Sequence, residues 1–479
     1  MVDNRPYDIK YAFKCLVWFL IVMMAMKYTG GAGFIIVVFM ALFGLAARKT
    51  EQLLFWLLVA TCMICVNNNF TSKGAAFVYS QRGLMVVLGV CMSVKMISAR
   101  IHPAIRPYGW IMAYLIFMFV PSSVGWDPIV SFLKLFLFTV VYFSYLGVAN
   151  DVGMSTNVSS EKLRSIMLAV AMLFIIGSVV LVPFPGISQL SPEEYISSGG
   201  GVNPMVTSLF TGMANHSQSL GPIVSSISVL LFADMLFSIK RFDKLYTFML
   251  LCCPYLIYKT SSRTGMGAYL LGMMFVAYCF MRSRGVGSRW KARVMSWMFI
   301  GFSLICVVFM LGGGAAATRK YLLKTHGENA ELNYENVASS RQFLVDMEME
   351  NFKKKPFIGN GFQVSEMMVG LKRQSIGDYL TAPIEKGVWV TAVLEEGGVI
   401  GWTIFVAFLL HCIVSGVRKG CYIGASGLFV FTVINLGEFS FFSMSYSGGF
   451  SWAMIFFGLA FDIKRLEAAK NSAWPIGRM

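Results

Sequence analysis

The chain has 479 residues, of which 57% are hydrophobic and only 13% are charged, and its mean hydropathy is +0.66. The core of a soluble domain cannot bury this much apolar sequence, so the composition excludes a soluble globular fold. The formal net charge of +16 does not indicate nucleic-acid binding, because the basic residues cluster in short loops between apolar runs.

Apolar runs of membrane-spanning length follow one another along the chain, separated by short polar breaks. They do not alternate apolar and polar residues, which argues against a β-barrel. Fourteen spans are expected, near residues 12–27, 31–47, 52–66, 83–98, 109–121, 129–149, 164–183, 218–239, 245–258, 264–281, 294–312, 396–416, 421–437 and 448–463. The predicted fold is an all-α polytopic helical membrane protein with about 12–14 transmembrane helices.

The basic residues mark one side of the membrane. If the N-terminus is cytoplasmic and the spans alternate, the inside loops include 48–49, 282–293 and 464–465, which are rich in Lys and Arg. The short outside loops carry little positive charge, so the pattern follows the positive-inside rule. Both termini are therefore predicted to be cytoplasmic.

Two outer segments, near 184–218 and 313–396, are much longer than the other connections. A connection of roughly 80 residues is usually functional or disordered. The segment near 313–396 contains "SSRQFLVDMEMENFKKKPFIGNGF", whose apolar residues have helical spacing, so a large helical loop on the outer face is expected. The predicted regions are an N-terminal transmembrane bundle (1–183), central transmembrane helices with the first outer loop (184–312), the large outer loop (313–395), and C-terminal transmembrane helices with a cytoplasmic tail (396–479).

Charged residues gather on the outer face of this topology. Arg263 lies in "YKTSSRTGMGAYLLG", between two apolar runs, where arginine is costly and no positive-inside signal explains it. The same face receives Asn215, His216, Arg341, Lys353–Lys355, Glu385 and Lys386. Such a cluster suits an anionic, membrane-embedded substrate such as a lipid-linked pyrophosphate, because the arginine fork matches phosphate oxygens. A carboxylate or a histidine there could act as general base.

These residues also have structural interpretations. Arg263 could be an interfacial anchor whose charged end reaches the lipid headgroups, and His216 could cap the next span. Lys353–Lys355 could be a solvated run. Glu395 and Glu396 precede an expected span, where carboxylates stabilise a helix N-terminus, so capping is their expected role.

The cysteines do not indicate a metal centre. Most of the ten cysteines lie inside apolar runs, where they behave as small hydrophobic residues. Cys62 and Cys65 have the spacing of a redox or zinc pair, but they lie mid-span without further ligands. Neither a metal nor a cofactor is expected.

Four stretches, in this order, resemble the O-antigen ligase and Wzy-type polysaccharide polymerase superfamily. They are "SLFTGMANHSQSLG" (208–221), "SSRTGMGAYLLG" (261–272), "SSRQFLVDMEMENFKKKPFIGNGFQ" (339–363) and "EKGVWVTAVLEEGGVIGW" (385–402). The stretch at 261–272 is similar to the family's Ser-Arg-(Ser/Thr)-Gly signature, with Arg263 as its key residue. The resemblance covers roughly residues 200–402, and it rests on the order, spacing and outer-face placement of the motifs together.

The resemblance implies an inverting, metal-independent glycosyltransferase whose active site faces the periplasm from the bacterial inner membrane. Its donor and acceptor would be glycans on undecaprenyl pyrophosphate, with a chain-length regulator and a flippase as candidate protein partners. Arg263 and Arg341 would bind the pyrophosphate, whose departure is the main electrostatic problem of the reaction. His216 and Lys386 are further candidate ligands of the pyrophosphate.

The general base is open between two residues of the large loop. Family members often carry a histidine where this chain has Glu385 and Lys386. Either Glu385 takes the role, since glycosyl transfer commonly uses a carboxylate, or His326 does.

Three functions remain open at this stage. The leading one is a polymerase that joins lipid-linked repeat units into exopolysaccharide or O-antigen. A ligase that transfers finished glycan to a lipid or another acceptor would use the same residues. A transporter or flippase for a lipid-linked sugar tends to place polar residues mid-membrane and to show inverted repeats, and neither is evident in the sequence.

Overall fold

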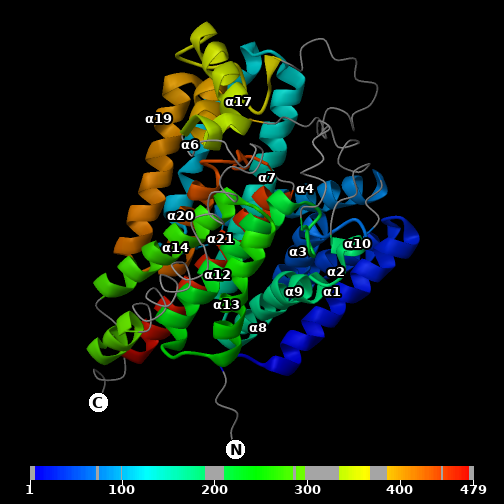
Figure 1. Ribbon diagram of the computed structural model, residues 1–479, viewed down its shortest axis with the longest axis vertical. Coiled ribbons are helices and arrows are strands. Elements are labelled where there is room, and N and C mark those ends of the chain that lie inside the picture. Colours follow the sequence, from blue (N-terminus) through cyan, green and yellow to red (C-terminus); the bar gives the residue numbers. More distant parts are fainter. Residues whose placement is uncertain are drawn as a thin grey trace, which may run out of the picture.

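The computed structural model describes residues 6–71, 75–98, 100–188, 210–283, 287–296, 334–366, 386–443 and 446–473. Within these ranges the chain is predominantly helical and forms no β-strand, although an isolated β-bridge joins Val66 to Ala214. Figure 1 shows a bundle of long helices, most of which run between the same two ends.

The elements follow the apolar runs of the sequence. In chain order they are α1 (Ile9–Thr29), η1 (Ala32–Phe34), α2 (Ile35–Ala46), α3 (Thr50–Cys65), α4 (Ala75–Ser98), α5 (Arg106–Gly109), α6 (Ile111–Val124), α7 (Pro128–Met154), α8 (Ser160–Ala171), η2 (Met172–Ile176), α9 (Gly177–Leu181), α10 (Pro185–Ser188), α12 (Ser217–Asp234), η3 (Met235–Ile239), α13 (Lys244–Lys259), α14 (Arg263–Arg282), α17 (Tyr334–Lys354), α19 (Trp389–Arg418), α20 (Tyr422–Ile434) and α21 (Tyr446–Ala473). The π-helical elements η2 and η3 continue α8 and α12.

Eight helical segments of the described residues are long and apolar enough to cross a membrane: Ile9–Thr29, Tyr79–Ile97, Arg106–Val124, Pro128–Met154, Ser160–Leu181, Gln218–Ile239, Arg263–Arg282 and Trp389–Arg418. Three shorter apolar helices accompany them, at Ala32–Ala46, Thr50–Cys65 and Tyr422–Ile434. The prediction of an all-α polytopic membrane protein is confirmed. Each expected span coincides with a helix, except for 294–312, most of which lies outside the described residues. The total of 12–14 spans stays a prediction.

Polar residues in the breaks determine where the helices begin. Asp127 accepts a hydrogen bond from Val130 N at 3.1 Å, and Pro128 follows it as the first residue of α7. Asp243 caps α13 in the same way. These side chains satisfy amide groups that the first helical turn leaves without an intrahelical partner. The short polar breaks are therefore the helix-start signals of the fold.

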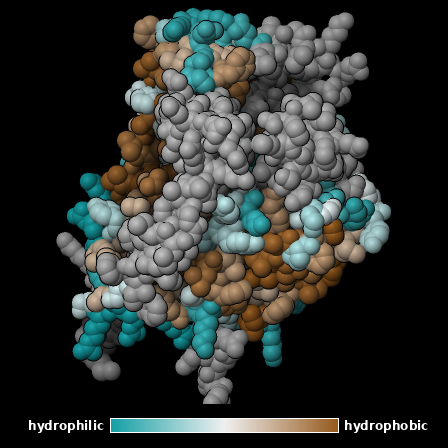
Figure 2. Space-filling model, in the orientation of Figure 1, coloured by the Kyte–Doolittle hydropathy of each residue, from teal (hydrophilic) through white to brown (hydrophobic). Residues whose placement is uncertain are grey.

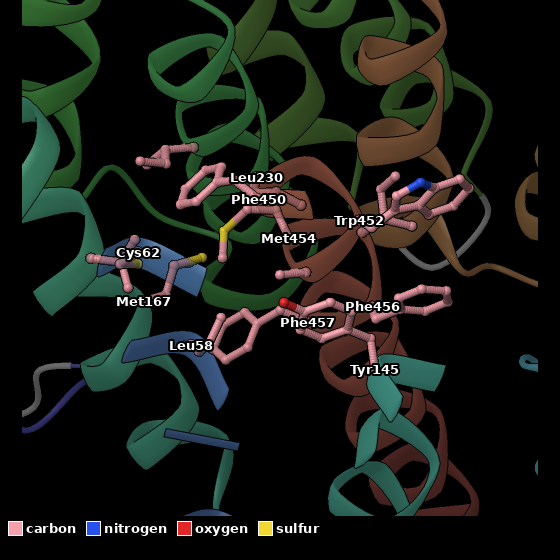
Figure 3. Packing of buried hydrophobic residues seen from close by; sticks show 14 of the residues in the cluster. Leu58, Cys62, Tyr145, Met167, Leu230, Phe450, Trp452, Met454, Phe456 and Phe457 are labelled. Carbon is pink, nitrogen blue, oxygen red and sulfur yellow. The ribbon is translucent and has the colours of Figure 1, made fainter. Parts of the chain in front are cut away.

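The centre of the bundle is α21, which packs against α3, α7, α12 and α20. Figure 3 shows its aromatic and sulfur-containing side chains meeting Leu58 of α3, Tyr145 of α7 and Leu230 of α12. The Trp452 side chain is fully buried, and its indole N–H donates to Phe441 O at 2.7 Å. Burial of the indole with its polar atom satisfied fixes this helix in the core.

Large apolar side chains also face outward in rows. On α1 the exposed residues include Phe13, Val17, Leu20 and Met24, whose spacing places them along one helical face. Figure 2 shows brown, hydrophobic side chains on the left and lower right flanks, and teal, hydrophilic ones at the top and along the lower rim. This is the surface expected of a protein whose flanks contact lipid.

The loops predicted to carry the basic residues meet at one end of the bundle. Lys162 pairs with Glu51 at 2.9 Å. Lys419 donates to Pro103 O at 3.1 Å, and His102 lies 3.0 Å from Glu467. In Figure 1 this end is the lower one, and α17 lies at the opposite, upper end. The grouping of these loops agrees with the alternation predicted from charge.

Candidate functional site

Two of the stretches that resemble the superfamily begin adjacent helices. His216 precedes α12, and its Nδ1 accepts a hydrogen bond from Gln218 N at 3.1 Å. Ser262 precedes α14, and its Oγ accepts a hydrogen bond from Gly265 N at 3.1 Å. Arg263 is therefore the first residue of α14, where it is half-buried.

Small residues bring α12 and α14 into contact. A Cβ on Gly221 would lie 2.4 Å from Ser262 Cβ, and a Cβ on Gly265 would lie 2.9 Å from the carbonyl carbon of Gly221. The Ser225 hydroxyl lies 2.7 Å from the carbonyl oxygens of both glycines. Close backbone approach through small residues is typical of helix pairs in membranes. The N-termini of α12 and α14 are thereby held side by side.

This arrangement places Arg263 at the positive end of a helix dipole. A helix N-terminus favours anions and disfavours cations by about 0.3–1 kcal/mol. The start of α12 adds a second N-terminus beside it. An anion at this end would therefore interact favourably with the guanidinium and with both dipoles.

Residues 435–443, which follow α20, link the helix pair to α19. Asn435 O accepts a hydrogen bond from Trp389 N, the first residue of α19, at 2.9 Å. A Cβ on Gly437 would lie 1.8 Å from Thr264 Cγ2, so this segment passes directly against the first turn of α14. The Phe441 and Trp389 rings lie 6.1 Å apart. The first turns of α12, α14 and α19 are thus at one end of the bundle.

The third and fourth stretches interlock through their backbones. Asn360 N donates to Glu395 O at 2.9 Å, and Gly361 N donates to Glu396 O at 3.0 Å. These carbonyl groups are available because α19 is interrupted at Gly398, which has a φ of 62°. A Cβ on Gly359 would lie 2.3 Å from Glu396 O. Gly359, Gly361 and Gly398 all have positive φ, and Gly359 and Gly398 also meet backbone closely, so glycine is required at these positions by left-handed conformations and by the crossing.

A buried set of charges lies beneath this crossing, and we call Glu348, Lys386, Glu395 and Glu396 the ion cluster. Lys386 Nζ lies 2.6 Å from Glu395 Oε2 and 3.3 Å from Glu396 Oε1. Asn351 Nδ2 donates to Glu395 Oε1 at 2.9 Å. The four residues of the ion cluster and Asn351 are each 4% exposed or less. The ion cluster thus joins α17 to the start of α19.

Glu348 closes the ion cluster from the side of α17. It accepts hydrogen bonds from Gly387 N at 2.6 Å and from the Thr391 hydroxyl. Burial raises the pKa of the Glu348 carboxyl, and the Thr391 hydroxyl and the Lys386 charge only partly oppose this. Burial alone would lower the pKa of Lys386, but the carboxylates of Glu395 and Glu396 outweigh it and hold that pKa well above the ordinary lysine value. The ammonium is therefore firmly charged.

The structure places the predicted ligands in different settings. His216 and Arg263 lie at neighbouring helix starts, as described above. Arg341 is half-buried on α17, one helical turn before Val345, which packs on Gly387. Lys386 is 4% exposed and its ammonium faces protein carboxylates, so its role as a pyrophosphate ligand stays a prediction.

The two candidate bases, Glu385 and His326, lie outside the described residues. The choice between them stays open.

One expectation is wrong. Glu395 and Glu396 were expected to cap a span that starts at 396, but α19 begins at Trp389 and both side chains lie inside it. They bind Lys386 instead of the helix N-terminus. The predicted boundary between 395 and 396 accordingly falls within one helix. Apolar sequence continues upstream of the two glutamates, from Val388 to Leu394, and this signal marks the earlier start.

Sequence reasoning missed Glu348, Asn351 and Asn360. The first two are three residues apart on α17, and all three are at most 1% exposed. Asn360 Nδ2 donates to Asn351 O at 3.0 Å, which ties the crossing to α17. The available signal was position, because Glu348 and Asn351 follow Val345 at intervals of three residues and so share one helical face with it.

No group of three or more His, Cys, Asp or Glu side chains among the residues with described positions is arranged to hold a metal ion. Cys62 and Cys65 are both buried in α3.

No protein-family model and no curated protein matches this sequence. The family resemblance therefore rests on the four sequence stretches alone.

Proposed function

We propose that this protein is a membrane glycosyltransferase that polymerises undecaprenyl-pyrophosphate-linked oligosaccharide repeat units. One observation supports the proposal above the others. The stretches that contain His216 and Arg263 are separated in sequence, yet they begin two helices that touch through Gly221 and Gly265. A cation at paired helix N-termini is a setting in which a phosphate group is favoured.

In the proposed reaction Arg263 binds the pyrophosphate through its two parallel N–H groups. As the bond from the anomeric carbon to the pyrophosphate oxygen breaks, negative charge grows on that oxygen, and the guanidinium stabilises it. Arg341 on α17 is the second proposed cation. A base in the large loop, Glu385 or His326, accepts the proton of the attacking hydroxyl, and inversion follows from attack opposite the leaving group.

The proposed orientation places this end of the bundle in the periplasm and both termini in the cytoplasm of a bacterial inner membrane. Single cysteines introduced at Lys354 of α17 and at Arg289 test it, because both residues are exposed and belong to opposite sides of the predicted topology. The exposed Cys91 is replaced in both variants. An impermeant thiol reagent added to intact cells should label position 354 alone, and labelling of 289 alone would reverse the orientation.

The decisive assay uses purified protein and lipid-linked repeat units, with product length read on a gel. A ladder of products supports the polymerase. A single transfer to a second acceptor identifies a ligase, and movement of the lipid across a vesicle bilayer without turnover identifies a flippase.

Substitution of Arg263 tests the site itself. Arg263→Ala should reduce the rate at least about a hundredfold, since one charge-assisted contact to a developing oxyanion contributes roughly 3–4 kcal/mol. Lys259→Ala is the matched control, because Lys259 ends the preceding helix, is exposed and lies over the Tyr255 ring at 5.8 Å. If the Arg263→Ala protein is as active as the control, Arg263 does not bind the pyrophosphate, and its role is that of an interfacial anchor.

A further inference from the structure

A polar pocket lies at the end of the bundle opposite to α17. Its walls are Thr50 at the start of α3, Lys95 near the end of α4, Arg100, and four residues at the end of α7: Asn150, Asp151, Met154 and Ser155. Its volume is about 300 Å³, which is at the lower end of the range for small-molecule sites. None of these residues takes part in the proposed glycosyl transfer.

The position of the pocket coincides with a membrane boundary. Two candidate spans, Tyr79–Ile97 and Pro128–Met154, both end at its walls. Lipid headgroups lie at the same depth as the ends of transmembrane helices. The pocket is therefore at the level where a phospholipid phosphate would be.

The charged side chains of the pocket are predominantly basic. Lys95 and Arg100 face one carboxylate, Asp151, with which Lys95 forms an ion pair. The Lys95 side chain is 48% exposed and that of Asp151 only 12%, so the lysine side of the ion pair faces solvent more than the carboxylate side does. Lys464 adds a further cation beside the pocket, where its ammonium donates to Ser155 O.

Asn150 holds the Arg100 backbone in place. Its side chain is buried, its Oδ1 accepts from His102 N at 3.0 Å, and its Nδ2 donates to Arg100 O at 3.3 Å. The segment that contains Arg100 is thus tied to α7. A basic residue on a fixed backbone is better suited to a specific phosphate than one on a mobile loop.

An apolar stripe leads away from the pocket along α4. Val87, Val90, Val94 and Ile97 have the spacing of one helical face, and they are 44%, 49%, 62% and 87% exposed. The stripe lies within the candidate span. Lys95 lies in its last turn, between Val94 and Ile97, and Arg100 follows it. A basic pocket at the end of an exposed apolar stripe matches a phospholipid, with its phosphate in the pocket and an acyl chain along the helix.

We propose that this pocket is a phosphate-binding site for the headgroup of an anionic phospholipid, with Lys95 and Arg100 as its ligands. The same chemistry would accept a soluble phosphate compound, so the test separates the two sources. The site is independent of the proposed glycosyl transfer, and its failure would leave that function untouched.

The test measures binding of phosphatidylglycerol to the full-length protein in nanodiscs of phosphatidylcholine, by native mass spectrometry. Arg100→Gln is the first variant, because Arg100 is exposed and its loss does not threaten folding. The second is Lys95→Gln combined with Asp151→Asn, which removes the ion pair as a unit. Lys10→Gln on α1, an exposed basic residue at the same end, is the control.

The wild type should retain phosphatidylglycerol in preference to phosphatidylcholine. Each pocket variant should bind phosphatidylglycerol with an affinity lower by a factor of roughly ten or more. The control should bind as the wild type does. Displacement of the lipid by millimolar inorganic phosphate would keep the phosphate site but assign it to a soluble compound. Equal binding of phosphatidylglycerol by the wild type and the pocket variants would overturn the proposal. Lys95 and Arg100 would then serve only to orient the chain in the membrane.

Discussion

Replacing Lys386 with methionine removes the only cation of the ion cluster. Methionine keeps most of the apolar stem, so Glu395 and Glu396 stay buried while their ammonium partner is lost. Removing one partner of a buried ion pair typically costs about 3–5 kcal/mol, because the remaining charge stays desolvated. The start of α19 should therefore become markedly less stable.

The same part of the chain supplies a matched control. Lys354 and Glu366 pair at 2.5 Å, close to the 2.6 Å of Lys386 and Glu395. Both side chains of the surface pair are 50% exposed, against 3% and 1% in the buried pair. An exposed pair contributes about 0–1 kcal/mol. Lys354→Met should consequently have little effect, although the chemical change is identical.

Thermal unfolding in detergent at one fixed scan rate, followed by tryptophan fluorescence, measures the difference. At about 2 °C per kcal/mol, the lower end of the usual range, Lys386→Met should lower the melting temperature by about 6–10 °C and Lys354→Met by about 2 °C at most. Adding Glu395→Gln to Lys386→Met should restore part of the loss, since it removes one of the stranded charges. Equal shifts for the two lysine variants would refute the reasoning.

Three further substitutions test the glycine crossing, the pH response and the base. Gly398→Ala should lower the melting temperature far more than Gly267→Ala, because Gly398 has a φ of 62° and its Cβ would meet backbone at 2.3 Å, whereas that of Gly267 meets nothing within 4 Å. The raised pKa of Glu348 means that its contribution to stability is complete below the ordinary carboxyl pKa and is lost as the pH rises through the raised value. We therefore expect the melting temperature of the Glu348→Gln protein to rise relative to that of the wild type between acid and neutral pH. A difference between the two melting temperatures that does not change with pH would contradict this. Glu385→Gln should abolish polymerisation with donor binding intact, by about a hundred- to ten-thousandfold in initial rate; a near-normal rate together with an inactive His326→Ala protein would assign the base to the histidine.

The spans could be predicted because each depends on local sequence. A long apolar run satisfies its own backbone hydrogen bonds as a helix and needs no distant partner to be recognised. Caps such as Asp127 and Asp243 are equally local. The start of α12 at Ser217 and that of α14 at Arg263 lie within a residue of the expected positions for this reason.

The ion cluster could not be predicted in this way. Whether Glu395 caps a helix or binds Lys386 depends on α17, which brings Glu348 and Asn351 from a distant part of the chain. The sequence shows that two glutamates precede a pair of glycines. It does not show that the backbone of residue 360 will cross this segment. A glutamate that is buried needs a charged or hydrogen-bonding partner, whereas an exposed one does not. Whether it is buried depends on how the helices of the bundle assemble.

The backbone crossing between residues 359–361 and Glu395–Glu396 has a consequence for biosynthesis. Because the chain is made from its N-terminus, α17 is complete before its binding partners on α19 exist. At about 5–20 residues per second, the roughly 35 residues that separate the two sides take about 2–7 s to synthesise. During that interval Glu348 and Asn351 lack the groups of residues 387–395 that they bind, so the contacts between α17 and α19 form only after α19 has been made. A chain truncated before residue 386 would therefore present α17 without the α19 surface that it packs against.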